Sequence, residues 1–112
     1  MFQTYKNKGF HIKFENNVNV SIQFGYGNYC ENYEGEQSNK YSNWSKDAEV
    51  AIWYQTSEGR HWITKRYCEE NDIDVDDVIP HQSPGEVLRI LNWASSQTKI
   101  EGEDINEVET CQ

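Results

Sequence analysis

Two runs near the start of the chain alternate strictly between apolar and polar positions. In residues 9–14 and again in residues 18–24, every second residue is Phe, Ile or Val. A period of two is typical of β-strands, because successive side chains point to opposite faces. Asn16 and Asn17 lie between the runs and tolerate the positive φ of a tight turn, so the pattern predicts one amphipathic β-hairpin.

The polar side of this hairpin is expected to face solvent as a hydrogen-bonding surface. Its members are His11, Lys13, Asn19, Ser21 and Gln23. The second run leads into residues 25–47, which have no periodicity and are rich in Tyr, Gly, Asn, Ser and Glu. A connection longer than about 15 residues is uncommon in a compact domain and is usually functional or mobile. Its tyrosines either contact a ligand or pack on the sheet, and the sequence leaves both interpretations open.

Two further elements follow. Residues 48–55 and 60–67 are rich in β-branched and aromatic residues, and a Gly-containing turn separates them, which predicts a second hairpin. Ser83, Pro84 and Glu86 then form a capping box with Pro at the first helical position. Apolar residues recur after it at helical spacing, which predicts a helix from Pro84 to about Gln97 with one apolar stripe on a sheet.

Together these elements predict an α+β fold. We expect an antiparallel sheet of about four strands, from two hairpins, with one C-terminal helix packed on one face. At 112 residues the chain is long enough for one domain with a single core, which we assign to residues 1–98. Residues 99–112 are acidic and sparsely apolar, so they are expected to form a flexible tail. The edges of such a sheet favour self-association.

Composition narrows the classes of partner. The net charge is −9, but residues 1–68 carry +1, from eight basic and seven acidic residues, whereas residues 69–112 carry −10, from two basic and twelve acidic residues. The chain lacks a clustered Lys/Arg stripe, which disfavours direct binding to nucleic acid. Fifteen aromatic residues supply apolar area despite a mean hydropathy of −0.94.

Cysteine usage and hydropathy bear on the compartment. Cys30, Cys68 and Cys111 are an odd set without CxxC spacing, which favours a reducing, cytosolic setting over a disulfide framework. No apolar run approaches 18 residues, and the first 25 residues lack the apolar segment of a secretion signal. We therefore expect no membrane association.

No motif for catalysis or metal binding is complete. The spacing of Asp72, Asp74 and Asp76 resembles the start of a calcium loop, but Ser83 stands where the bidentate Glu belongs. The histidines and cysteines lack the close pairing of zinc ligands, and nothing local activates Cys30 as a nucleophile. Residues 25–28, Gly-Tyr-Gly-Asn, lack the rest of a phosphate loop and favour a strand-terminating turn. The expectation is a non-enzymatic protein without a cofactor.

Four segments carry a family resemblance. They read NKGFHIKFENNVNVSIQFGYGNYCENY, DAEVAIW, RHW and QSPGEVLRILNWA. The chain thus resembles a family of short uncharacterised proteins of tailed bacteriophages, whose members follow NKGxHxxFxN, a VSxQFGxGNYCxN block and a helix opened by Ser/Thr-Pro. The similarity covers roughly residues 7–97. It implies a phage accessory protein that works in the cytoplasm of the bacterial host, where such proteins commonly blunt host defences.

Two functions of different classes follow. In the first, the protein binds or sequesters a small nucleotide-like ligand, with rings stacking on the base and cations meeting phosphate. The residues assigned to this site are His11, Lys13, Gln23, Asn28, Tyr29, Arg60 and Arg66. In the alternative, the protein is an acidic inhibitor that occupies a basic surface of a host protein, one that normally holds DNA. The residues assigned to that surface are Glu69, Glu70, Asp72, Asp74, Asp76 and Asp77, with the acidic tail beyond them.

Overall fold

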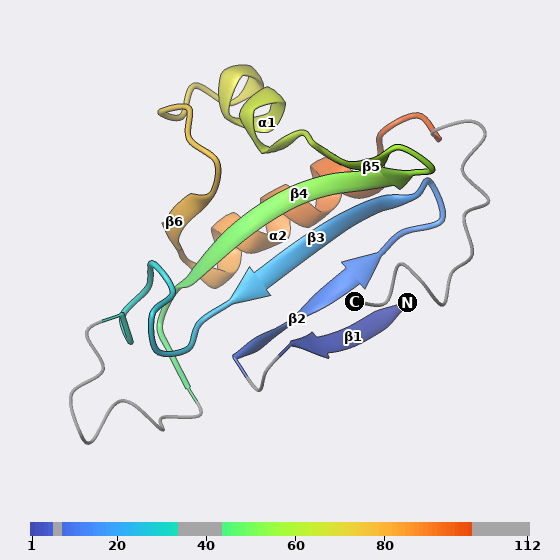
Figure 1. Cartoon of the computed structure of the whole chain (residues 1–112). Helices are drawn as coiled ribbons and strands as arrows, with labels where there is room; N and C mark the ends of the chain where they lie inside the picture. Colours follow the sequence, from blue (N-terminus) through green and yellow to red (C-terminus); the bar gives the residue numbers. More distant parts are fainter. Residues whose placement is uncertain (6–7, 34–43, 100–112) are drawn as a thin grey trace.

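The computed structural model describes residues 1–5, 8–33 and 44–99 and has an α+β architecture, as predicted (Figure 1). One antiparallel sheet has the order β1-β2-β3-β4-β5, and β6 pairs with β4 beside β5. The strands are β1 (Phe2–Tyr5), β2 (Gly9–Lys13), β3 (Val18–Gln23), β4 (Ala48–Thr56), β5 (Gly59–Trp62) and β6 (Ile79–Gln82). The helices are α1 (Thr64–Glu70) and α2 (Pro84–Ser95). The sheet is therefore larger than expected, by the short strands β1 and β6, and α1 is an additional helix.

The first hairpin is confirmed. β2 and β3 pair in register, with Phe10 opposite Ile22 and Ile12 opposite Val20. Asn17 has a φ of 72°, as the turn requires. The preceding Asn16 ties this turn to the end of α2, because its Nδ2 donates to the carbonyl of Ala94 at 2.8 Å and to that of Gln97 at 2.9 Å.

The core lies between the sheet and α2. One face of β3 and β4 contributes fully buried Val and Ile side chains, and Ile90 and Ala94 of α2 pack against them. Figure 1 shows α2 crossing behind β3 and β4. Each Val or Ile buried there stabilises the fold by about 1.5–3 kcal/mol. The predicted helix forms with its capping box intact: Ser83 Oγ accepts from the Glu86 N–H at 3.2 Å, and Glu86 Oε1 accepts from the Ser83 N–H at 2.8 Å.

The second hairpin is shorter than predicted. A strand was expected over residues 60–67, but β5 ends at Trp62 and α1 begins at Thr64. The cause is a tertiary contact: the Thr64 hydroxyl accepts from the Ile52 N–H at 3.0 Å and donates to the Ile52 carbonyl at 3.3 Å. This side chain therefore replaces a strand neighbour for β4. Tyr67 and Cys68 are buried with Thr64, at the i+3 and i+4 spacing of a helix face.

The outer edge of β4 is consequently shared by two strands. β5 pairs with β4 over Trp53–Thr56, and β6 pairs with its other end at Ala48 and Val50. Between them the chain leaves the sheet, forms α1 and returns. Trp93 of α2 packs edge-on against Tyr67 of α1, with ring centres 5.2 Å apart, so both helices join one core. None of the described helices is long and apolar enough to cross a membrane.

Candidate functional site

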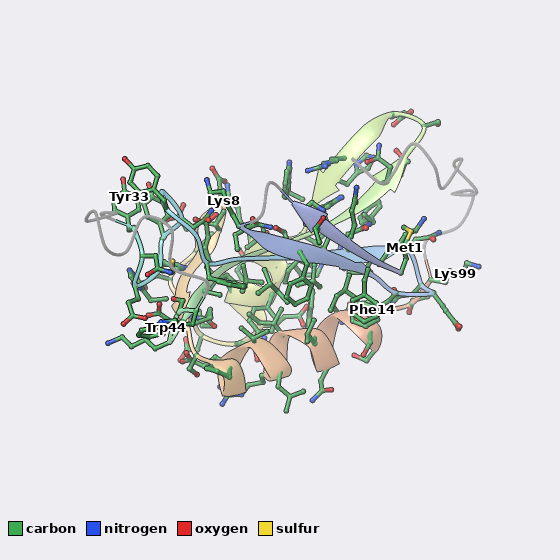
Figure 2. All side chains as sticks on the ribbon, turned by 90° about the horizontal axis from the view of Figure 1, so that it is seen from below. Met1, Lys8, Phe14, Tyr33, Trp44 and Lys99 are labelled. Atoms are coloured by element: carbon green, nitrogen blue, oxygen red, sulfur yellow. The ribbon has the colours of Figure 1, made fainter. Side chains whose placement is uncertain are left out.

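The face of the sheet that points away from α2, here called the open face, carries the polar residues of the first hairpin. Figure 2 shows Lys8 and Tyr33 on this side and Phe14 on the α2 side. The predicted solvent exposure is wrong, because His11, Asn19, Ser21 and Gln23 are all buried. No described helix covers them. A large ring does so in part: Trp53 is 3% exposed and meets the His11 ring edge-on, with centres 5.0 Å apart.

Arg60 and two tryptophans form a ring cluster at the β4–β5 end of the open face. The guanidinium carbon of Arg60 lies 4.4 Å from the ring centre of Trp53 and 5.6 Å from that of Trp62. The two indoles are themselves 5.3 Å apart. Burial lowers the pKa of His11 below its ordinary value, and the charge of Arg60 lowers it further. His11 is therefore neutral at neutral pH and brings no cation to this face.

Gln23 is the exceptional member of the polar row. Its Nε2 donates to Ser21 Oγ at 3.1 Å. Its Oε1 is buried and has no hydrogen-bond partner. Leaving a buried acceptor unsatisfied costs about 1–3 kcal/mol, so this atom is a local cost to the stability of the fold.

Asn28 and Tyr29 lie in the loop that follows β3. Asn28 Oδ1 accepts from the Gly25 N–H at 2.9 Å, and Gly27 has a φ of 87°. Other N–H groups of this loop are also occupied, for example that of Gly27 by the Tyr33 carbonyl at 3.3 Å. These bonds support the strand-terminating turn rather than a phosphate loop, because the Asn28 oxygen and the loop amides are already used to hold the turn.

Lys13 and Arg66 lie apart from the ring cluster. Lys13 is on the open face of β2, and it also lines a cavity of about 780 Å³ between β1, the first hairpin turn and the end of α2. Arg66 is exposed on α1 and lines a smaller cavity of about 300 Å³ with Val18 and Tyr54, on the α2 side of the sheet. A single site that includes both Arg66 and His11 is therefore ruled out by the fold.

A third cavity lies where β5 gives way to α1, and we call it the edge notch. It has a volume of about 510 Å³ and is lined by Trp62, Thr64, Lys65, Asp77 and Val78. Trp62 is 56% exposed, although it belongs to the ring cluster. Lys65 Nζ lies 3.7 Å from Asp77 Oδ1 across the notch. Apart from the neighbouring Arg60, sequence reasoning assigned no ligand-binding residue here, because a continuous strand over residues 60–67 would leave no notch.

The acidic residues assigned to the alternative function lie on the end of α1 and on the segment leading to β6. Glu69, Glu70, Asp72, Asp74, Asp76 and Asp77 are all exposed. Glu70 Oε1 accepts from the indole N–H of Trp93 at 2.8 Å, which ties the start of this segment to α2. Within the described residues, no three His, Cys, Asp or Glu side chains gather as metal ligands would.

Two of the three cysteines lie within the described residues. Cys30 and Cys68 are free and buried, and burial raises the pKa of both thiols. Both are therefore protonated at neutral pH. Cys30 Sγ accepts from the Asn32 N–H at 3.4 Å, which gives it a place in the loop after β3. Cys111 and the predicted tail from residue 100 onward lie outside the described residues, as does Tyr41 of the long loop.

The structure thus distributes the predicted ligand residues over several places. His11, Gln23 and Arg60 share the open face, Tyr29 lies at its end, and Arg66 is on the other side. No protein-family model, curated protein or solved structure matches the chain. Functional inference therefore depends on the geometry of the chain itself.

Proposed function

We propose that the protein is a non-enzymatic bacteriophage accessory protein that binds a small nucleotide-like ligand in the edge notch. The observation that carries the proposal is a half-exposed tryptophan, Trp62, on the wall of a cavity of about 510 Å³. Ligand pockets typically measure about 300–1,000 Å³, so a nucleotide-sized molecule fits. The indole offers one face for stacking a base, an interaction worth about 1–3 kcal/mol.

The charges beside Trp62 suit an anionic group on the ligand. Lys65 lines the notch, and Arg60 lies beside Trp62 on the open face. The ion pair between Lys65 and Asp77 is solvent-exposed, and such pairs contribute about 0–1 kcal/mol. A ligand phosphate therefore competes easily for Lys65. Asp77 then remains as an acceptor for ligand hydroxyl or amino groups.

The wall of the notch is held rigidly before any ligand arrives. Thr64 is buried, and both of its hydroxyl bonds go to Ile52 of β4. The Ile63 N–H donates to the Ile52 carbonyl at 2.9 Å, which fixes the residue after Trp62. A preorganised wall loses little conformational entropy on binding, which favours affinity.

The biological setting of the proposal comes from the resemblance to tailed-phage proteins. It supports a role in counter-defence in the cytoplasm of the bacterial host, by sequestering a nucleotide signal. The exposed Trp62 also suits self-association, so we propose that ligand binding and oligomeric state are measured together by native mass spectrometry of protein purified from cells.

Thermal unfolding with a panel of cyclic nucleotides and ADP-ribose compounds tests the ligand. At a hundredfold excess over Kd, one of them is expected to stabilise the fold by about 2.7 kcal/mol. Trp62→Ala should abolish the stabilisation. Trp44→Ala is the matched control, since Trp44 is also exposed but lies by a different cavity. No stabilisation by any compound, or the same stabilisation in both variants, would retire the notch as the site.

The alternative function is supported by a separate observation. Six acidic side chains over residues 69–77 are exposed and lie close together in the chain, which suits a basic partner surface. A variant with all six changed to their amides should lose salt-sensitive capture of a basic host protein, whereas Trp62→Ala should retain it. If the amount of captured host protein is the same at low and high salt and the same for the amide variant, the result would count against an acidic inhibitor.

A further inference from the structure

Two tyrosine rings stand in solvent at the end of the open face. Tyr29 and Tyr33 are 49% and 43% exposed. Their rings stack with centres 5.2 Å apart and planes 22° from parallel. Half-exposed stacked rings offer a flat apolar and π-electron surface that the fold itself does not use.

The loop that carries these rings is held firmly. The Tyr29 N–H donates to Glu49 Oε1 at 2.7 Å, and the Tyr29 carbonyl accepts from the His81 N–H at 3.0 Å. Asn32 Nδ2 donates to the Phe24 carbonyl at 2.9 Å and to the Trp44 carbonyl at 3.0 Å. The exposure of the rings is therefore imposed by a fixed backbone, and a partner that meets them loses little entropy in ordering the loop.

A carboxylate lies beside the rings. Gln23 on β3 lies directly opposite Glu49 on β4, and both belong to the open face. Side chains opposed in this way have Cβ atoms about 4.5–5.5 Å apart. Glu49 brings a carboxylate to the surface, whereas Gln23 is 5% exposed and its amide is turned toward Ser21. The Glu49 carboxylate beside the rings therefore favours a cationic donor from outside.

The basic groups nearby do not fill this demand. His11 is neutral, and the imidazole Nδ1 of His81 already meets Asp47 Oδ2 at 3.2 Å. The Lys8 ammonium extends over the loop toward Gly27, 3.8 Å from where a Cβ on that glycine would lie. Lys8 is therefore the competing cation of this region.

We propose that Tyr29, Tyr33 and Glu49, the tyrosine platform, bind an arginine side chain of a basic partner protein. A guanidinium can stack on an aromatic face and at the same time pair with a carboxylate. Arg60 over Trp53 shows the stacking part of such a contact within the chain itself. The Glu49 carboxylate supplies the local negative charge that favours a basic partner. This inference is independent of the edge notch.

NMR titration of the full chain with short blocked peptides tests the ligand class. The probes are Gly-Arg-Gly, Gly-Lys-Gly and Gly-citrulline-Gly, each acetylated and amidated. The arginine peptide should shift the ring signals of Tyr29 and Tyr33 and bind about five- to tenfold more tightly than the lysine peptide, because lysine cannot stack or pair bidentately. Citrulline, which lacks the charge, should not bind. Equal affinity for all three peptides, or shifts away from these rings, would overturn the proposal.

Variants assign the contacts. Tyr33→Ala and Glu49→Gln should each weaken arginine binding at least about fivefold, and Glu49→Gln keeps an acceptor for the Tyr29 N–H, so the loop survives. Lys8→Gln should strengthen binding about twofold by removing a like charge, whereas it would weaken an anion site. Trp62→Ala is the control and should leave binding unchanged. Preserved amide spectra verify folding, and unchanged affinity in both Tyr33→Ala and Glu49→Gln would contradict the assignment.

Discussion

The two faces of the sheet are buried to a similar degree by different means. On the α2 side, Val20 and Ile52 are fully buried under a second layer of structure. On the open face, Asn19 and Gln23 are almost as well buried, yet no described helix lies over them. Rings such as Trp53 and neighbouring strands exclude water there instead. The alternation of apolar and polar residues along a strand thus shows which residues share a face, but it does not show whether the polar face is exposed to solvent.

The two faces also differ in what holds them together. Burial of Val and Ile on the α2 side is favourable by itself, in proportion to area. Burial of amides and hydroxyls on the open face costs free energy unless the group finds a partner, as Gln23 Nε2 does with Ser21 and Gln23 Oε1 does not. We therefore expect stability to depend on the α2 side and ligand contacts to concentrate at the ends of the open face.

The sharpest test of this difference uses two adjacent residues on opposite faces. Ile22→Gln puts an amide into the apolar core and should lower the free energy of unfolding by about 3–5 kcal/mol. Gln23→Leu removes the unpartnered Oε1 but also the bond to Ser21 Oγ, and because these two effects oppose each other it should change the free energy of unfolding by less than about 1 kcal/mol. Urea unfolding of both variants measures the contrast, and equal losses would show that the two faces are energetically alike.

The link between the first hairpin and α2 should have the next largest effect. Asn16→Ala removes both side-chain bonds to the carbonyls of Ala94 and Gln97, together with the bond that Asn16 Oδ1 accepts from the Val18 N–H at 3.0 Å, and should cost about 1–3 kcal/mol. Asn17→Gly in the same turn keeps the positive φ and should cost almost nothing. Urea unfolding distinguishes them, and a neutral Asn16→Ala would mean that the hairpin and α2 are not coupled.

The capping box should contribute a smaller amount on the α2 side. Ser83→Ala removes the acceptor for the Glu86 N–H and should lower stability by about 1 kcal/mol. Ser95→Ala at the other end of α2 serves as the control, because its hydroxyl is exposed. Thermal unfolding followed by circular dichroism detects the difference. Identical unfolding temperatures for the two variants would mean that the Ser83 cap does not contribute measurably to stability.

The smallest effect is a pH dependence on the open face. The pKa of His11 is lowered in the fold, chiefly by burial, so below its ordinary value of 6.5 the unfolded chain binds the proton more readily. This contribution to stability is complete above pH 6.5 and is lost as the pH falls toward the pKa of folded His11. His11→Gln should reduce the slope of stability against pH between 7.5 and 5.5, as measured by urea unfolding. An unchanged slope would mean that His11 is accessible to solvent.

Local signals predicted the parts of the fold that local interactions determine. Alternation located β2 and β3, the Asn pair located their turn, and the Ser83 capping box located the start of α2. The prediction of a strand over residues 60–67 was wrong beyond Trp62. The strand propensity of its β-branched and aromatic residues was outweighed by a contact between Thr64 and Ile52, which are distant in sequence. β1 and β6 are four residues each and too short to give a periodic signal.

The candidate sites were predictable to a lesser degree. Arg60 and Tyr29 were assigned from residue type, and each lies beside exposed rings. Lys65 was assigned to no site, and Asp77 was assigned only to the acidic protein-binding surface, because the two side chains meet only when the chain turns at Ile63. Sequence reasoning also treated Asn28 as a ligand contact, whereas its Oδ1 closes the turn at Gly25. An Asn side chain that stabilises its own loop and one that contacts a ligand cannot be distinguished by residue type and position in the sequence.

Accessibility of single side chains to a soluble paramagnetic agent tests the central claim most directly. In NMR of the full chain, the side-chain amide protons of Asn19 and Gln23 should be broadened as little as core signals, whereas the rings of Tyr29, Tyr33 and Trp62 should be broadened strongly. Strong broadening of the Asn19 and Gln23 amides would show that the polar side chains of the open face are exposed to solvent. It would contradict their burial and would make the middle of this face the candidate binding site again.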